Sequence, residues 1–271
     1  MLPQPPTHLH MGATAQAVFT TGQVIPILVL GVIALRVLRR DRDAVPLLLM
    51  FGGAAAMLCE PIVDVMGLCY FPRAGQWRLF EAFGRPIPWF ILVYVWYVGG
   101  QSFIALRQLE KGATVRDVWR LYAVFAVLDM VVETPGLYMH LYTYYGRQPF
   151  DFFRLPLWWP VVNGAMPIVT ATLIYRLRPR LRGGAILAVI PIVPMADALT
   201  NAAAGFPLWV TLNTRLGYAW TYPVGVITCL LALLVVWMAA QAVHEPKIAV
   251  ATGRARTAVP AVPVGATVPA R

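Results

Sequence analysis

The sequence predicts an all-α, polytopic membrane protein with seven transmembrane helices. Of its 271 residues, 59% are hydrophobic and only 13% are charged, whereas a soluble domain carries roughly 25% charged residues. The mean hydropathy is +0.66. Apolar runs of about 20 residues, the length that crosses a bilayer as a helix, recur seven times along the chain. These observations exclude an ordinary water-soluble enzyme.

The seven apolar runs divide the chain into a membrane domain and two tails. No Lys or Arg precedes the first run, which is also too long for the core of a cleavable signal peptide. Residues 243–271 are rich in Ala, Pro, Val and Thr and predict a disordered cytoplasmic tail. Residues 1–16 form the N-terminal tail, and the membrane domain is 17–242. The predicted spans are 17–38, 44–69, 86–107, 117–139, 156–175, 184–205 and 217–242.

The basic residues predict the orientation of the helices. Alternate connections and the C-terminal tail together hold 16 Lys and Arg, and the other set holds 6. The positive-inside rule then places the N-terminus outside and the C-terminus in the cytoplasm, as an odd number of spans requires. The formal net charge of +10 is therefore read as an orientation signal, and we expect no nucleic-acid partner. The predicted location is a bacterial cytoplasmic membrane.

Apart from Asp117 at the end of the fourth span, five acidic residues lie inside the predicted spans, where each costs about 3 kcal/mol on insertion scales. They are Glu60, Asp64, Asp129, Glu133 and Asp197. The first four form two i,i+4 pairs, and Asp197 has Asn201 at the same spacing, so each helix presents two polar groups on one face. The helical rise of about 1.5 Å per residue places all five acids at one depth in the outer half. We expect three helices to converge on one chamber, although structural pairing with polar neighbours is the alternative for any single acid.

The aromatic residues are biased toward the same side of the membrane. In or beside the three outer loops lie 24 of the 32 Trp, Tyr and Phe residues. An interfacial belt is the simpler explanation, but a belt occupies both interfaces, and the inner side has few aromatic residues. We therefore predict that aromatic residues and two asparagines line the chamber and bind the substrate. They are Trp77, Trp89, Tyr94, Trp158, Trp159, Asn163 and Asn201.

Several familiar membrane chemistries are excluded by residues that the sequence lacks. Lys111 and Lys247 are the two lysines, and neither lies in a span, so a retinal Schiff base has no attachment site. Asp-rich diphosphate-binding runs are missing, and the four histidines do not pair at metal-ligand spacing within a span. We predict no metal and no cofactor. Three cysteines are too scattered for a disulfide framework or a zinc site: Cys59, Cys69 and Cys229.

A chamber of buried acids and aromatic faces has the components of acid-initiated carbocation cyclisation. Two carboxyl groups four residues apart in a dry site do not both ionise, so each pair is expected to retain a proton and act as a general acid toward an alkene or epoxide. Aromatic faces attract cations, and exclusion of water prevents early capture of the carbocation. A second carboxylate removes the final proton. Lipid-soluble prenyl chains reach such a chamber from the bilayer.

The sequence resembles one family of such enzymes. Seven spans in about 240 residues, with Glu60 in the second span and acids in a later one, resemble the small integral-membrane terpene cyclases of fungal meroterpenoid pathways. The high Ala, Arg and Val content suggests a bacterial counterpart. This resemblance implies an isomerase or intramolecular lyase that cyclises a farnesylated apolar substrate, made by an upstream prenyltransferase in meroterpenoid biosynthesis.

A second, weaker resemblance rests on a local motif. The segment LDMVVE at 128–133, followed by Tyr144, Gly146, Pro156 and Asn163, is similar to the spirocyclase family of avermectin-type polyketide pathways. It implies acid-catalysed ring closure on a polyketide.

Two alternatives from other classes stay open. One is a proton-coupled small-molecule transporter or a receptor-like binding protein, and the other is a structural partner without chemistry. A transporter needs access from both sides of the membrane, yet the inner halves of the acid-bearing spans contain no acid beyond Asp117 at a helix end. We therefore predict a membrane terpene cyclase whose partners are a prenylated substrate and membrane lipid.

Overall fold

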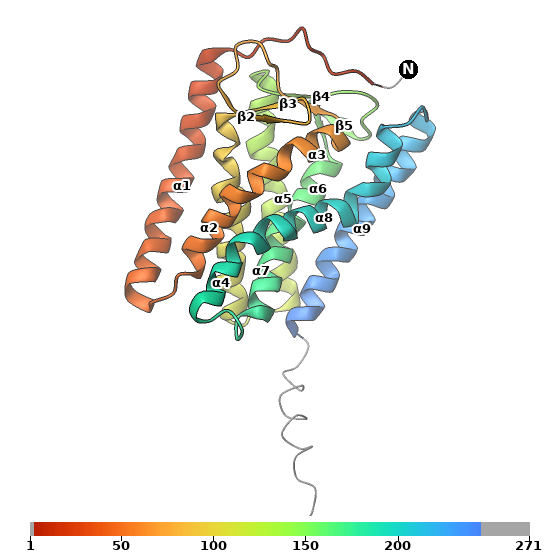
Figure 1. Ribbon diagram of the computed structural model, residues 1–271. Helices are drawn as coiled ribbons and strands as arrows, with labels where there is room; N and C mark the ends of the chain where they lie inside the picture. The colour runs from red at the N-terminus through yellow and green to blue at the C-terminus, as the bar shows by residue number, and fades with distance from the viewer. Residues whose placement is uncertain (1–2, 245–271) are drawn as a thin grey trace, which may run out of the picture.

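The structure is a computed structural model that describes residues 3–244 of the chain. Helices account for 72% of it, and they run roughly alongside one another in a bundle (Figure 1). Six of the described helices are long and apolar enough to cross a membrane. The chain therefore has the architecture of a mostly helical, polytopic membrane protein.

Two of these six helical crossings are interrupted, so that each consists of several shorter helical segments. The second consists of α2 (Val45–Ala56), a 3₁₀ turn (Met57–Cys59) and α3 (Glu60–Gly67). The third consists of a 3₁₀ turn (Trp89–Leu92), a π-helix (Val95–Gly100) and α4 (Gln101–Glu110). The remaining crossings are α1 (Ala13–Asp41), α5 (Val115–Tyr138), α8 (Val189–Leu212) with the 3₁₀ turn before it (Gly183–Ala188), and α9 (Tyr218–His244).

The fifth predicted span is broken in the structure. It consists of α6 (Trp158–Asn163) and α7 (Ala165–Leu177), which are separated at Gly164. A Cβ atom at Gly164 would meet the backbone of Ala126 on α5, so the glycine lets the break pack closely against that helix. Neither piece alone has the length of a crossing, which is why six long helices stand where seven spans are predicted. The count of seven stays a prediction, as does the orientation.

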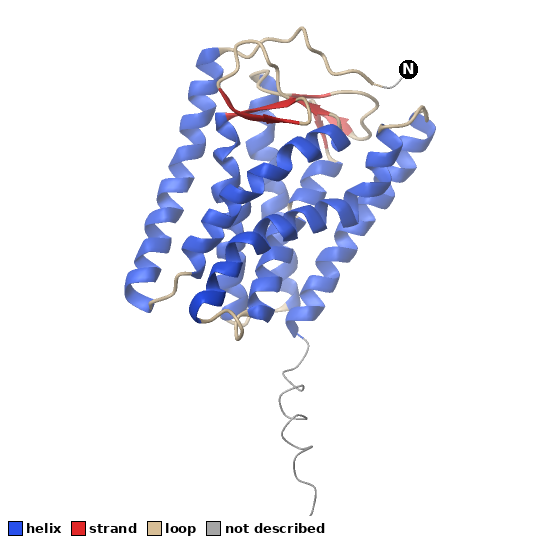
Figure 2. Cartoon of the chain, viewed as in Figure 1, coloured by secondary structure: helices blue, strands red, loops and turns tan. Residues whose placement is uncertain are grey.

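Short antiparallel strands cover one end of the bundle, which we call the hairpin end (Figure 2). Most of their residues lie in connections that the sequence predicts as loops, but Cys69, residues 86–88 and Pro156 fall at the ends of predicted spans, which are shorter in the structure. The pairs are β1 (Cys69–Tyr70) with β4 (Thr143–Tyr144), β2 (Arg78–Ala82) with β3 (Arg85–Pro88), and β5 (Asp151–Phe152) with β6 (Leu155–Pro156). In the first pair Cys69 is opposite Tyr144, which ties the end of α3 to the segment after α5.

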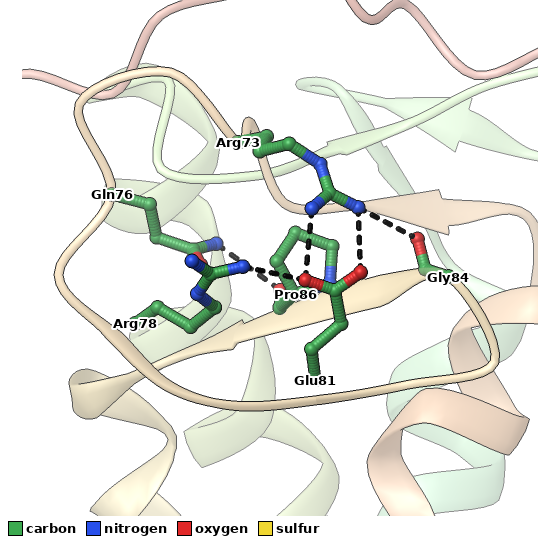
Figure 3. Close-up of polar contacts among 6 residues, drawn as sticks. All are labelled: Arg73, Gln76, Arg78, Glu81, Gly84 and Pro86. Atoms are coloured by element: carbon green, nitrogen blue, oxygen red, sulfur yellow. Dashed lines mark hydrogen bonds and ion pairs between the residues drawn. The ribbon is translucent and has the colours of Figure 1, made fainter.

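Polar contacts fasten the loop before β2 onto its hairpin (Figure 3). Arg73 donates two hydrogen bonds of 2.8 Å to the Glu81 carboxylate, and Arg78 donates a third of 2.6 Å. Gln76 Nε2 donates to the carbonyl of Pro86 at 3.1 Å. Hydrogen bonding to the two guanidinium groups, Arg73 first, holds the pKa of Glu81 below its ordinary value. Glu81 is exposed, so its contacts with the two arginines order the loop locally and add little to the stability of the whole protein.

The N-terminal segment is also bound to the hairpin end. The backbone N–H of Met11 donates to the Ala74 carbonyl at 2.9 Å, and Met11 is fully buried. Gln16 Nε2 donates to the Gly75 carbonyl at 2.9 Å, while Gln16 Oε1 accepts from the backbone N–H of Trp77 at 2.7 Å. The last four residues of the predicted tail of 1–16 therefore belong to α1, which begins at Ala13. The predicted tail of 243–271 lies outside the described residues after its first two.

Ion pairs join three connections at the opposite end. Arg178 Nη2 lies 2.7 Å from an Asp43 carboxylate oxygen, and its Nε lies 3.5 Å from Glu110. Arg107 pairs with Glu110 at 3.0 Å and also lies within 3.7 Å of Asp41 and Asp43. The half of the bundle nearer this end, away from the strands, is packed with apolar side chains, among them Leu49, Phe103, Leu106, Ile174 and Val193.

Candidate functional site

A cavity lies among the helices, next to the strands of the hairpin end, and its empty space, including the part open to solvent, is about 720 Å³. Its wall comes from α1, α3, α5, α6, α7, α8 and the interrupted third crossing, with residues of β1 and β4 closing it. Segments far apart in the sequence therefore meet around one space. Four of the five predicted acids lie in its wall: Glu60, Asp64, Asp129 and Glu133.

The i,i+4 spacing of the acids gives the arrangement that the sequence predicts. Glu60 and Asp64 lie on one face of α3, and Asp129 and Glu133 lie on one face of α5. The two helices thus present two carboxyl groups each to the same cavity. Asp197 is different, because it is fully buried and does not line the cavity, whereas its partner Asn201 does.

Three of the four carboxyl groups accept a hydrogen bond from a tyrosine. Tyr94 donates to Glu60 at 2.5 Å, and Tyr144 donates to Glu133 at 2.7 Å. The Tyr97 hydroxyl donates to Asp129. Each phenol belongs to a different chain segment from its carboxyl group, so these bonds fix the acids in the wall and join the segments around the cavity.

Asn163 brings the two carboxyl groups of α5 together. Its amide Nδ2 lies 3.3 Å from Asp129 Oδ1 and 3.4 Å from Glu133 Oε1. Asn163 is the last residue of α6, so the break at Gly164 places this amide at the cavity. One neutral amide shared by two buried carboxyl groups does not balance two negative charges, which favours a shared proton at this pair.

Asp64 has the least hydrogen bonding of the four acids in the wall. It is 2% exposed, and its Oδ2 has no hydrogen-bond partner among the described residues. The neighbouring thiol of Cys69 is buried, and burial followed by the charge of Asp64 raises the pKa of Cys69 well above its ordinary value. Cys69 therefore stays a neutral thiol.

Asp197 and Asn201 form a polar pair behind the cavity. Asn201 Nδ2 donates to Asp197 Oδ1 at 3.1 Å and lies 3.1 Å from the sulfur of Met166. Asp197 is fully buried and does not face the cavity, so its carboxyl group orients Asn201. The predicted depth of Asp197 does not reveal this, because depth along a helix does not fix the direction of the side chain.

A π-helix positions two of the phenols. Val95–Gly100 forms the wider π turn, a feature that often marks functional sites in helices. Tyr94 directly precedes this turn, and Tyr97 lies within it. Their hydroxyls donate hydrogen bonds to acids on two different helices, α3 and α5. The turn itself packs against α2, because a Cβ atom at Gly53 would meet the Tyr94 carbonyl and the Gly99 amide nitrogen.

Two further tyrosines contribute from the strand side. Burial, and next the charge of Glu133, raises the pKa values of Tyr142 and Tyr144 well above the ordinary value. Both phenols therefore remain protonated and act as donors. Tyr144 donates to the Glu133 carboxyl, and Tyr142 donates to the Glu133 backbone carbonyl at 3.0 Å.

The aromatic wall is formed in part by residues other than those predicted. Tyr94, Trp159, Asn163 and Asn201 line the cavity as expected. Trp77 and Trp89 do not, since they lie outside the wall and are 44% and 47% exposed. Trp158 is buried behind Trp159, with the two ring centroids 4.0 Å apart. Sequence reasoning missed six rings that line the cavity: Phe19, Phe71, Phe90, Tyr97, Tyr142 and Tyr144.

Trp159 is fixed on both sides. Trp158 stacks on one face, and Gly67 at the end of α3 leaves room for the ring, since a Cβ atom there would meet it. Gln148 connects these parts, because its Nε2 donates to the Gly67 carbonyl at 2.9 Å and its Oε1 accepts from Trp158 Nε1 at 3.1 Å. The indole of Trp159 thus forms a rigid part of the wall.

The cavity wall concentrates acidic groups, and the buried Arg85, which acts electrostatically on Asp64, lies outside this wall. Among the described residues that line the cavity, none is Lys, Arg or His. Four carboxylates in one wall without a cation would repel one another in a poorly hydrated space, so they do not all ionise. The arrangement can store protons and can donate and accept them.

Metal-binding geometry is not found in the part of the chain that the structure describes. Within residues 3–244, no group of three or more His, Cys, Asp or Glu side chains is arranged to hold a metal ion. Comparison with known proteins finds no family model, no curated protein and no solved structure that matches the chain.

Proposed function

We propose that the protein is a membrane terpene cyclase that closes rings on a prenylated, apolar substrate by acid-initiated carbocation chemistry. A carboxylic acid of the cavity donates a proton to an alkene or epoxide of the prenyl chain. The resulting cation is attacked by a further double bond, which forms the ring, and a carboxylate removes a proton from the last cation. The proton count balances, so the product is an isomer of the substrate.

The observation that carries this proposal is the cluster of four carboxyl groups in a cavity wall with no cation among its described residues, two of them, Asp64 and Asp129, almost fully buried. General acid catalysis needs a carboxyl group that keeps its proton near neutral pH. Three of these groups are oriented by tyrosine hydroxyls. Asp64 has an oxygen without a partner among the described residues, and we assign it the role of proton acceptor at the end of the reaction.

The aromatic rings of the wall support the same chemistry. Trp159, Phe71 and Phe90 present apolar faces in a cavity that also holds the acids. Such faces attract a cation by about 0.5–2 kcal/mol each, without the nucleophilic atoms that would end the reaction early. A farnesyl chain attached to an indole or a cyclodipeptide, supplied by a prenyltransferase in a bacterial cytoplasmic membrane, is the substrate class that we propose.

Packing on the other side of the cavity favours an enzyme over a transporter. The half of the bundle away from the strands is filled by buried apolar residues such as Leu49, Phe103 and Leu106. A transporter must open its site to both sides of the membrane, whereas an enzyme needs one chamber. The acids lie beside the strands, with this apolar layer beyond them.

A specific observation favours a second candidate, a spirocyclase acting on a polyketide. Residues of the local motif meet in the site, since Tyr144 bonds to Glu133, and Asn163 contacts both Asp129 and Glu133. Acid-catalysed spirocyclisation of a dihydroxyketone also needs carboxyl groups that donate and accept protons, and it releases one water. A change of substrate mass therefore separates the two candidates.

The test is ring closure by the purified full-length chain in detergent. Farnesylated indole and its terminal epoxide are incubated with the protein, and products are separated by chromatography and identified by mass spectrometry. We expect a cyclic isomer of unchanged mass from one of them, with no effect of EDTA. Loss of 18 mass units from a linear dihydroxyketone would support the spirocyclase instead. Protein that keeps its thermal transition but converts none of these compounds would contradict the proposal.

A further inference from the structure

A second cavity, whose empty space including the part open to solvent is about 390 Å³, lies where α8 ends and α9 begins. Two guanidinium groups and three threonine hydroxyls contribute to its wall: Arg147, Arg215, Thr211, Thr214 and Thr221. No Asp or Glu is among the described residues that line it. The chemistry of this wall is therefore that of an anion site, opposite in charge to the central cavity.

Hydrogen bonds order the wall of this pocket. Arg147 Nη1 donates to the Leu216 carbonyl at 2.9 Å, which ties the segment between β4 and β5 to the α8–α9 connection. Thr214 Oγ1 donates to the Thr211 carbonyl at 2.8 Å. A guanidinium group has five N–H donors in a planar fork that matches the oxygens of a phosphate. Arg215 is exposed beside it, with no ion-pair partner among the described residues.

The surroundings of the pocket are those of a lipid interface. The α8–α9 connection is at the hairpin end of the bundle (Figure 1), and both of its helices are long and apolar enough to cross a membrane. Large apolar side chains are exposed next to the pocket, with Leu216 42%, Trp220 59% and Tyr222 45% exposed. Exposed aromatic residues at the end of a spanning helix lie at headgroup level. Acyl chains can follow the apolar surface of α9 from there.

We propose that this pocket binds the phosphodiester headgroup of a membrane lipid in the leaflet at the hairpin end. The two arginines contact the phosphate oxygens, and the lipid chains extend along the exposed apolar side of α9. Basic pockets between spanning helices bind anionic headgroups on the cytoplasmic side of membranes, and the same guanidinium–phosphate pairing would operate here in the leaflet at the hairpin end. Lipid binding here is independent of any reaction in the central cavity, so either proposal can fail without the other.

The test measures lipid retention by the full-length protein in detergent, using native mass spectrometry. Phosphatidylglycerol is titrated against the wild type and against the double variant Arg147→Gln/Arg215→Gln. We expect about a tenfold or greater loss of affinity in the double variant, because charge-assisted hydrogen bonds to phosphate are lost. The variant Arg147→Lys/Arg215→Lys keeps both charges and should recover part of the affinity.

Three controls make the result specific. Arg154→Gln removes one positive charge at the same end, outside the pocket, and should leave retention unchanged. Diacylglycerol has the same chains without the phosphate and should bind equally to wild type and double variant. Inorganic phosphate should compete only at far higher concentration than the lipid. Equal retention by wild type and double variant, an equal loss in Arg154→Gln, or equally strong binding of inorganic phosphate would overturn the proposal.

Discussion

The hydroxyl of Tyr94 fixes the Glu60 carboxyl in the cavity wall by a 2.5 Å hydrogen bond. Replacing Tyr94 with Phe keeps the ring and removes this bond. A lost hydrogen bond to a carboxyl group corresponds to about 1–3 kcal/mol, so we expect the rate of ring closure to fall roughly tenfold to hundredfold. Tyr138→Phe removes a hydroxyl from a tyrosine that is 51% exposed and serves as the control. A wild-type rate in Tyr94→Phe would show that this bond does not orient a reacting acid.

Trp159 and Trp77 form a matched pair for the role of aromatic faces. Trp159 lines the cavity, whereas Trp77 lies outside its wall and is 44% exposed. Leu at position 159 keeps apolar volume but removes a π face that attracts a nearby cation by about 0.5–2 kcal/mol. About 1.4 kcal/mol changes the branching between competing steps tenfold. We expect altered product ratios in Trp159→Leu, with more early-quenched products, and an unchanged pattern in Trp77→Leu. Identical ratios in both would assign Trp159 to packing alone.

At the scale of elements, the π-helix depends on close packing against α2. A Cβ atom at Gly53 would meet backbone atoms of Tyr94 and Gly99, which cannot move aside as a flexible side chain can. Overpacking of this kind typically destabilises by about 1–3 kcal/mol. We expect Gly53→Ala to lower the thermal unfolding midpoint in detergent. Gly22→Ala is the control, since a Cβ atom there meets nothing within 4 Å. Equal midpoints for both variants would mean that α2 and the π-helix are not tightly coupled.

Regular spacing is what made part of the site predictable from sequence. The i,i+4 pairs of α3 and α5 needed only a helical repeat to place their four carboxyl groups together. The π turn that directs Tyr97 and the strand pairing that brings Tyr144 to Glu133 depend on contacts between distant segments. No local pattern carries that information. Trp77 and Trp89 are aromatic like the wall residues, but they flank the β2–β3 hairpin, whose strand pairing sets them outside the wall.

The same limit applies to the fifth predicted span. Its apolar run is long enough to predict a single span, but the structure divides it at Gly164, where close packing against Ala126 is made possible by the missing side chain. Hydropathy reports how apolar a segment is and does not report where it breaks. The break has a consequence for the site, because it leaves Asn163 at the end of α6 beside Asp129 and Glu133.

At the scale of the whole molecule, the orientation in the membrane remains a prediction from the 16 to 6 distribution of Lys and Arg. A reporter fused after residue 245 should be cytoplasmic, and one fused before residue 10 should be external. Two reporters, one active only in the cytoplasm and one active only outside it, measure the location of each fusion point directly. In that orientation the hairpin end and both cavities near it face outward. An external C-terminal reporter would reverse the orientation and place the acids in the inner leaflet.

The central claim is that the carboxyl groups of the cavity transfer the proton in ring closure. Its most direct test compares the rates of Glu60→Gln, Asp64→Asn, Asp129→Asn and Glu133→Gln with that of the wild type on the same prenylated substrate. General acid catalysis contributes roughly 10²–10⁴-fold, so we expect losses of that size in protein that still inserts and purifies. Glu110→Gln, at the opposite end of the bundle, should keep the wild-type rate. Wild-type rates in all four cavity variants would contradict the account.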